Sequence, residues 1–228
     1  MRFNDHDDEL DDGVHFPIPR DETNRLCALY GDLNEKKGAS VIGSMLALRH
    51  SGERQNYILS DEQKAAVKEA TDKGDKNFDI PEEELKIETV FDPFEFFVST
   101  RGGEAKEMLA IYDVMRGIRD EMEIHTVGMG KVMSAGVPLL AAGTKGKRKI
   151  GKYCRVMIHN VQAGAIGDID DVKKELEEIE LMQDQNIKIL AEETTMTEAG
   201  IRSLLTTKTN VYLSAEEALS YGIADIIV

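Results

Sequence analysis

The sequence of 228 residues lacks tryptophan, contains two cysteines and has no long apolar run. The cysteines, Cys27 and Cys154, lie in apolar stretches typical of strands, without metal-ligand spacing or a disulfide framework. We therefore expect a protein without a metal site, in the reducing cytoplasm. No apolar run approaches the roughly 20 residues that a membrane-spanning helix needs, and the acidic, polar beginning of the chain does not fit a signal peptide.

Basic residues are scarce relative to acidic ones. Lysine and arginine number 28 against 43 aspartates and glutamates, which gives a net charge of −15 and a pI near 4.8. An acidic surface disfavours nucleic acids and anionic membranes as the main partners. One basic cluster is interpreted as a solvated loop, and it consists of Lys145, Lys147, Arg148, Lys149 and Lys152.

The composition predicts one domain with two polar segments. With 41% hydrophobic residues, the chain can bury one substantial core, which we place in residues 21–228. Residues 1–20 hold six acids between Asp5 and Asp12 and cannot offset the entropy of packing. They are interpreted as a mobile arm, either a solvated tail or a segment that is ordered in an assembly. Residues 51–86 are highly charged, with a short helix over Asp61–Thr71, and are interpreted as an insertion.

A strand, a turn and a helix follow one another three times. The strands are predicted over Leu26–Tyr30, Pro93–Val98 and Glu123–Val127, and the helices over Gly38–Arg49, Met108–Ile118 and Ala135–Ala142. This repetition favours an α/β fold with a parallel sheet, whose functional loops lie at the carboxyl ends of the strands. Later strands are predicted over Cys154–His159 and Ile223–Val228, and short helices over Thr197–Leu205 and from Ser214.

The predicted helix over Asp168–Thr194 is unusually long. Its apolar residues lie along one side, at Leu176, Ile179, Met182, Ile187 and Leu190. A helix of this length is long for one small core. Its apolar face either packs wholly on its own sheet or partly meets another subunit.

A serine stands in the glycine-containing turn Gly130–Gly136, and a histidine ends the following strand. Glycines around a nucleophile permit a tight turn that exposes the hydroxyl and lets a substrate carbonyl approach the main chain. Histidine is the side chain best suited to accept a proton near neutral pH. This order suggests a serine peptidase with Ser134 as nucleophile and His159 as general base. Alternatively, Ser134 caps the next helix and His159 is a satisfied core residue.

Five motifs in order resemble one protein family. They are Ser99-Thr100-Arg101-Gly102-Gly103, Gly130 to Gly136, Ala142 to Arg148, Arg155-Val156-Met157-Ile158-His159, and Leu213 to Ala218 with Tyr221-Gly222. Together they resemble the proteolytic subunit of the Clp protease, ClpP, which has the crotonase-like fold. The resemblance runs from about Leu26 to Val228, interrupted by residues 51–86. It implies repeated strand-turn-helix units and a protruding long helix.

The resemblance also implies roles for individual residues. It places the catalytic serine of the family on Ser134 and the catalytic histidine on His159. The two backbone amides that stabilise an oxyanion fall on Gly103 and Ala135. The chain departs from the family at Arg101, where proline is usual. A guanidinium there either favours acidic peptides or is simply a surface side chain.

The third member of the triad is altered. A carboxylate normally accepts a hydrogen bond from the other ring nitrogen of the histidine and stabilises the imidazolium. The family's aspartate falls on Thr206, and no carboxylate lies between Arg202 and Ser214. Thr206 brings no charge, so we expect weak, serine-dependent activity that Thr206→Asp would raise. Asn210 or an acid such as Asp168 is an alternative third member.

The resemblance implies an assembly as well. We expect a homo-heptamer, or a tetradecamer of two rings, and Thr209 and Asn210 replace the Arg-Asp pair that helps two rings meet. The sequence has no G-x-x-x-x-G-K-[ST] phosphate loop, so we expect neither ATP hydrolysis by that route nor a cofactor. A separate AAA+ unfoldase would then have to deliver folded substrates.

Three functions compete on this evidence. The first is a serine endopeptidase subunit of a ring-shaped Clp-type protease, acting on peptides or unfolded proteins. The second is a catalytically weak or inactive structural ring subunit, because the aspartate is missing. The third is a crotonase-type acyl-CoA enzyme, which shares the fold and the backbone oxyanion hole without needing a Ser-His pair.

Overall fold

The computed structural model describes residues 25–75, 79–81, 84–207 and 210–228, and the expected arm over residues 1–20 lies outside them. The described chain forms two compact units. The smaller one is Gly52–Asp92, close to the segment expected to be an insertion. The larger one comprises residues 25–51 together with Pro93–Val228 and carries all the residues of the candidate site.

The smaller unit consists of a two-stranded ribbon and one helix. Strand β2 (Glu53–Ile58) pairs antiparallel with β3 (Lys86–Phe91), and helix α2 (Asp61–Asp72) lies between them in sequence. Ser60 begins α2 with a capping box, because its hydroxyl accepts from the Gln63 amide while the Gln63 side chain accepts from the Ser60 amide. The ribbon is absent from the sequence prediction, since half of its side chains are exposed and its polar and apolar residues do not alternate.

The larger unit is built on a seven-stranded sheet. Its strands are β1 (Leu26–Tyr30), β4 (Phe94–Thr100), β5 (Ile124–Met133), β6 (Lys149–Ile150), β7 (Arg155–His159), β8 (Asn210–Leu213) and β9 (Ile226–Ile227). The order is β1-β4-β5-β6-β9, with β7 beside β5 and β8 beside β7. All these pairings are parallel except the antiparallel pair β7–β8. The predicted α/β class with a mostly parallel sheet is confirmed.

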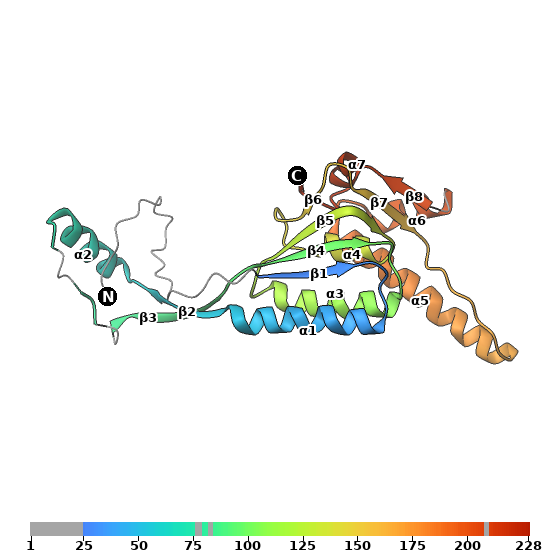
Figure 1. The fold of residues 1–228 in the computed structure, drawn as a ribbon, viewed down its shortest axis with the longest axis horizontal. Coiled ribbons are helices and arrows are strands. Elements are labelled where there is room, and N and C mark those ends of the chain that lie inside the picture. The colour runs from blue at the N-terminus through green and yellow to red at the C-terminus, as the bar shows by residue number, and fades with distance from the viewer. Residues whose placement is uncertain (1–24, 76–78, 82–83, 208–209) are drawn as a thin grey trace. The chain divides into compact units, whose positions relative to one another are not determined.

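Helices pack against this sheet through buried apolar faces. They are α1 (Glu35–Gly52), α3 (Ala105–Arg119), α4 (Gly136–Ala141), α5 (Ile169–Glu193), α6 (Glu198–Thr207) and α7 (Ala215–Ser220). Figure 1 shows α1 and α3 side by side under the strands β1 and β4. The face that α3 buries follows the helical period, with Met108, Ile111, Met115 and Ile118 all at most 2% exposed.

Strand β5 is longer than the sequence predicts. Its second half lies in the stretch expected to be a turn, and it changes neighbours along its length: Gly128 pairs with β6, whereas Val132 pairs with β7. The register against β4 shifts between Val98 and Thr100, which marks a bulge. Gly130 has a φ of 66° at this bulge, a conformation that glycine adopts without strain. The glycines therefore bend the strand and do not end it.

Helix α5 is buried only toward its C-terminal end. Ile187 and Leu190 are at most 2% exposed, whereas Leu176 and Leu181, nearer the N-terminus, are about half exposed. Figure 1 shows this N-terminal part of α5 extending beyond the sheet. Despite its length, α5 is too polar to cross a membrane, and the same holds for every other helix among the described residues.

Residues 53–91 in the smaller unit should be dispensable for folding of the rest of the chain. The amide of Asp92 donates to the carbonyl of Gly52 at 2.9 Å, so the two ends of residues 53–91 lie next to each other. Replacing 53–91 with about four Gly/Ser residues should therefore leave a soluble, cooperatively unfolding protein. Circular dichroism and thermal unfolding measure this. Val98→Asp, which buries a charge in β4, is the control for loss of folding. An insoluble excision variant would contradict the prediction.

Candidate active site

Ser134 stands in a strained backbone turn directly after β5. It has a φ of 53°, which is uncommon for a residue with a side chain. The Ser134 amide donates to the carbonyl of Met157 at 2.8 Å, and its carbonyl accepts from the amide of Val137 at 3.0 Å. The turn is thus fixed to β7 on one side and to the first turn of α4 on the other. A strained strand-to-helix turn of this kind exposes a hydroxyl.

His159 ends the neighbouring strand β7 and faces Ser134. The distance between His159 Nε2 and Ser134 Oγ is 2.7 Å. Burial lowers the pKa of His159 below its ordinary value of 6.5, because it disfavours the charged ring. The imidazole is therefore neutral at neutral pH and can accept the hydroxyl proton. Ser134 is not a helix cap, since Ala135 occupies that position and α4 has no side-chain cap.

The loop Gly102-Gly103 lies against the serine. A Cβ on Gly102 would stand 2.5 Å from the Cβ of Ser134, and one on Gly103 would stand 1.9 Å from the carbonyl oxygen of Leu33. Both residues also have positive φ, 105° and 147°. The Leu33 amide donates to the carbonyl of Gly102 at 2.7 Å. Only glycine fits at these positions, so the loop can approach the nucleophile closely.

Thr100, which sequence analysis did not assign a role, fixes this loop. Its side chain is fully buried, and its hydroxyl accepts from the Gly102 amide at 2.9 Å. Its methyl group also occupies the space that a Cβ on Gly136 would need. A hydroxyl residue two positions before a glycine is the local signal for such a side-chain turn, and it could have identified Thr100.

Two backbone amides at the site are available to a ligand. Neither the Gly103 amide nor the Ala135 amide donates a hydrogen bond to another described residue. A Cβ on Gly102 would stand 3.1 Å from the Ala135 nitrogen, so the glycine loop and this amide are neighbours. Unpaired N–H groups beside a nucleophile can stabilise a developing oxyanion.

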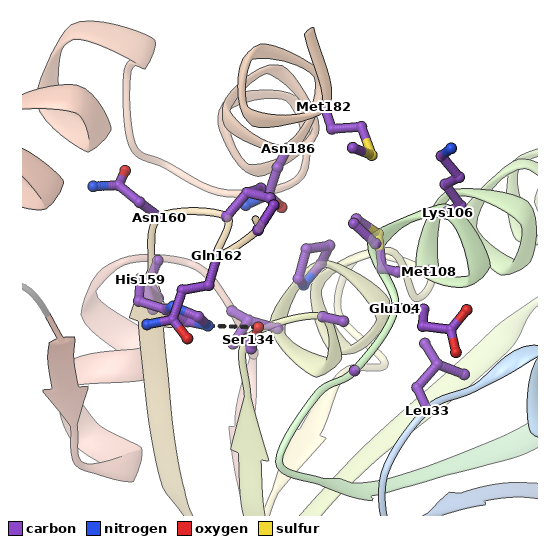
Figure 2. Close-up of a pocket in the computed structure, with 18 of the residues that line it drawn as sticks. Leu33, Glu104, Lys106, Met108, Ser134, His159, Asn160, Gln162, Met182 and Asn186 are labelled. Carbon is purple, nitrogen blue, oxygen red and sulfur yellow. Dashed lines mark hydrogen bonds between the residues drawn. The ribbon is translucent and has the colours of Figure 1, made fainter. Parts of the chain in front are cut away.

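A cavity of about 580 Å³ opens over Ser134 and His159. Figure 2 shows the pair at one side of it, with Met108 and Met182 at the other. Val137, Pro138 and Leu190 add to its apolar lining, whereas its charged lining residues are Arg101, Glu104 and Lys106. Arg101 is exposed, so the structure places a guanidinium at this cavity as well as at the surface.

No hydrogen bond joins the expected third residue, Thr206, to the histidine. His159 Nδ1 is buried and has no hydrogen-bond partner among the described atoms. Thr206 is in the last turn of α6, where its hydroxyl donates to the carbonyl of Arg202 at 2.7 Å. Asp168 begins α5, and its carboxylate accepts from the amides of residues 170 and 171. Asn210 lies directly across from His159 in the β7–β8 pair.

Comparison of the sequence with known proteins places the chain in a family. The sequence profile of the family described as Clp protease matches residues 85–228, which is more than half of the chain. The chain belongs to the Clp protease family. The matched range contains the glycine loop, Ser134 and His159, and the resemblance read from the sequence motifs is confirmed.

Individual relatives agree with this assignment. The chain is 34% identical over 132 residues to "ATP-dependent Clp protease proteolytic subunit 1" of Prochlorococcus marinus, and 33% identical over 132 residues to subunit 2 of a Synechococcus species. It is 38% identical over 130 residues to subunit 1 of Corynebacterium glutamicum. These alignments cover 57–58% of this chain and 61–66% of the relatives, slightly less than two thirds of their length.

The contact between the glycine loop and Ser134 gives a test. Gly102→Ala should prevent labelling of Ser134 by a fluorophosphonate, because the new methyl group collides with the Ser134 side chain. Gly146→Ala is the matched control, since Gly146 also has positive φ, 82°, but a Cβ there meets nothing within 4 Å. It should lower stability by roughly 1–2 kcal/mol and keep the labelling. Equal labelling of both variants would show that close contact of Gly102 with Ser134 is not required for the reaction of Ser134.

Proposed function

We propose that this Clp protease chain is a serine endopeptidase subunit that hydrolyses peptide bonds through Ser134 and His159. The observation that carries the proposal is the 2.7 Å contact between His159 Nε2 and Ser134 Oγ, beside two unpaired backbone amides. Nucleophile, base and oxyanion donors are the groups that acyl transfer requires. The contact supports this chemistry independently of the family assignment.

In the first step, Ser134 Oγ attacks the carbonyl carbon of the scissile peptide while its proton passes to His159 Nε2. A C–O bond forms, and the electron pair of the carbonyl bond moves to the oxygen. The amides of Gly103 and Ala135 donate to this oxyanion. Loss of one such donor typically lowers kcat by about 10² to 10³.

In the second step, the imidazolium of His159 returns the proton to the leaving nitrogen as the C–N bond breaks. The acyl group remains on Ser134 as an ester. Water then attacks the ester carbon and gives a proton to His159, the C–O bond to Ser134 breaks, and the protonated ring restores the hydroxyl. The products are a free amine and a carboxylic acid.

The substrates that fit this site are peptides and unfolded proteins. The lining of the cavity combines apolar residues with polar and charged ones, which suits an extended peptide chain that carries apolar side chains. The relatives are named ATP-dependent, whereas this sequence has no phosphate loop of the Walker A type. We therefore assign ATP hydrolysis to a separate AAA+ unfoldase that acts with this chain.

A structural ring subunit of low activity is the second candidate. The observation that favours it is the unpartnered His159 Nδ1, with no carboxylate bonded to the ring among the described residues. The crotonase-type function is the third, and it predicts turnover of an acyl-CoA thioester that does not depend on Ser134.

Labelling and hydrolysis separate these candidates. The wild-type chain should react with a fluorophosphonate and cleave a short fluorogenic peptide, and Ser134→Ala should abolish both, because it removes the nucleophile. Ser44→Ala, on the exposed side of α1, is the matched control and should change neither. No labelling of a folded assembly would support the structural subunit. Acyl-CoA turnover retained in Ser134→Ala would support the crotonase-type enzyme.

We also propose a closed heptameric ring, single or doubled. Exposed apolar residues gather at the N-terminal part of α5 and in the segment before it, namely Ile166, Ile169, Leu176 and Leu181. Closed symmetry buries such a repeated patch.

Native mass measurement tests the ring. The wild-type assembly should have about seven or fourteen times the mass of the 25.4 kDa monomer, and Leu176→Glu with Leu181→Glu should shift it toward the monomer, because charges replace apolar contacts. Tyr153→Ser, which removes an exposed ring elsewhere, is the control and should keep the assembly. A wild-type monomer at micromolar concentration would contradict the proposal.

A further inference from the structure

We propose that Asn210 is the positioning residue for His159, taking the place of the missing carboxylate. This inference rests on the proposed peptidase function of Ser134 and His159. Asn210 would accept a hydrogen bond from Nδ1–H of His159 through its amide oxygen. The bond would hold the ring in the tautomer whose Nε2 accepts the proton of Ser134.

His159 needs a hydrogen-bond acceptor at its Nδ1 atom. Nδ1 of His159 is buried and has no hydrogen-bond partner in the described part of the chain, although the other ring nitrogen is bonded to Ser134. A neutral imidazole has one N–H and one acceptor nitrogen. If Nε2 accepts from the serine, Nδ1 must carry the hydrogen, and a buried N–H is normally satisfied.

The order of the strands points to the source of that partner. Strand β7 lies between β5, which leads to Ser134, and β8, which begins with Asn210. His159 and Asn210 are directly opposite in the antiparallel register, so their side chains stand on the same face of the sheet. The nucleophile therefore lies on one side of the histidine and Asn210 on the other.

The two side chains are within reach of each other. Residues directly opposite in an antiparallel pair have Cβ atoms about 4.5–5.5 Å apart. The Asn210 side chain is exposed and makes no hydrogen bond to another described side chain or backbone group. In our proposal, rotation about its Cα–Cβ bond brings the amide oxygen to Nδ1, and no hydrogen bond from the Asn210 side chain to a described residue has to break.

Three other polar side chains that could be considered for this role are already engaged. The Thr206 hydroxyl donates to the carbonyl of Arg202, and the Asp168 carboxylate caps α5. The amide oxygen of Asn160, the next residue after the histidine, accepts from Gln183 at 3.1 Å. Asn210, by contrast, is opposite His159 in the β7–β8 pair, and its side chain makes no hydrogen bond to another described residue.

An asparagine and a carboxylate do different things at this position. Asparagine orients the ring and selects its tautomer but adds no charge to stabilise the imidazolium. Aspartate does both and raises the pKa of the histidine. Asn210→Asp should therefore raise kcat, whereas Asn210→Ala should lower it without a comparable change in KM.

The experiment compares peptide hydrolysis by four variants across pH. Asn210→Ala should lower kcat about tenfold or more, and Asn210→Asp should raise it by a similar factor. In Asn210→Asp the acidic limb of the kcat/KM profile should move to higher pH, because the histidine then holds its proton more tightly. Tyr212→Asp adds the same charge on the same face of β8, but opposite Met157, and should shift this limb less. Thr206→Asp tests the position at which the family pattern places the third member of the triad.

The outcomes separate this inference from the proposed function. If wild-type activity and labelling depend on Ser134 but all Asn210 variants match the wild type, Asn210 has no role and the peptidase assignment stands. If Thr206→Asp raises kcat and Asn210→Asp does not, the third position belongs to Thr206. Equal shifts for Tyr212→Asp and Asn210→Asp would show a general charge effect and would also overturn the inference. Labelling that persists in Ser134→Ala would instead refute the peptidase.

Discussion

The site depends on the parallel pairing of β5 with β7. Met133 is in register with Met157, and the next amide, that of Ser134, donates to the carbonyl of Met157. This places Ser134 beside His159, which follows two residues later on β7. A slip of the register by one residue would turn either side chain to the other face of the sheet. The 2.7 Å contact between them is therefore a property of the sheet, and the strained turn at Ser134 depends on it.

A second constraint holds the cavity wall in place. Glu193, at the end of α5, is 1% exposed, accepts from Tyr112 Oη at 2.9 Å and pairs with Arg119 at 2.8 Å. Burial, and then the negative charge of Glu193, raise the pKa of Tyr112, so the phenol remains a donor. Breaking such a buried pair typically costs about 3–5 kcal/mol. The network joins α5 to α3. Both helices contribute to the lining of the cavity, α5 through Leu190 and α3 through Met108.

The sequence predicts those parts of the molecule that local patterns determine. The apolar period of α3 and the small-residue turn around Ser134 are local signals, and the structure contains a helix and a sharp turn there. The bulge in β5 and the register of β8 against β7 are not local, because they arise when distant strands pair. The sequence could align Thr206 with a catalytic aspartate, but it could not reveal that Asn210 is opposite His159.

In the proposed mechanism, the absence of a carboxylate at Nδ1 of His159 still leaves other contributions to catalysis. In a serine protease, removing a triad member still leaves about 10³ to 10⁴ of rate enhancement from substrate binding and the oxyanion hole. Here the amides of Gly103 and Ala135 belong to backbone fixed by Thr100, Leu33 and the strained turn. Burial also keeps His159 neutral, and a neutral ring is the form that can take a proton. In the proposed mechanism the weak point is the imidazolium, which forms without a counter-charge. That mechanism is therefore limited by the missing charge at one ring nitrogen of His159, whereas the proposed nucleophile, base and oxyanion donors are already close together.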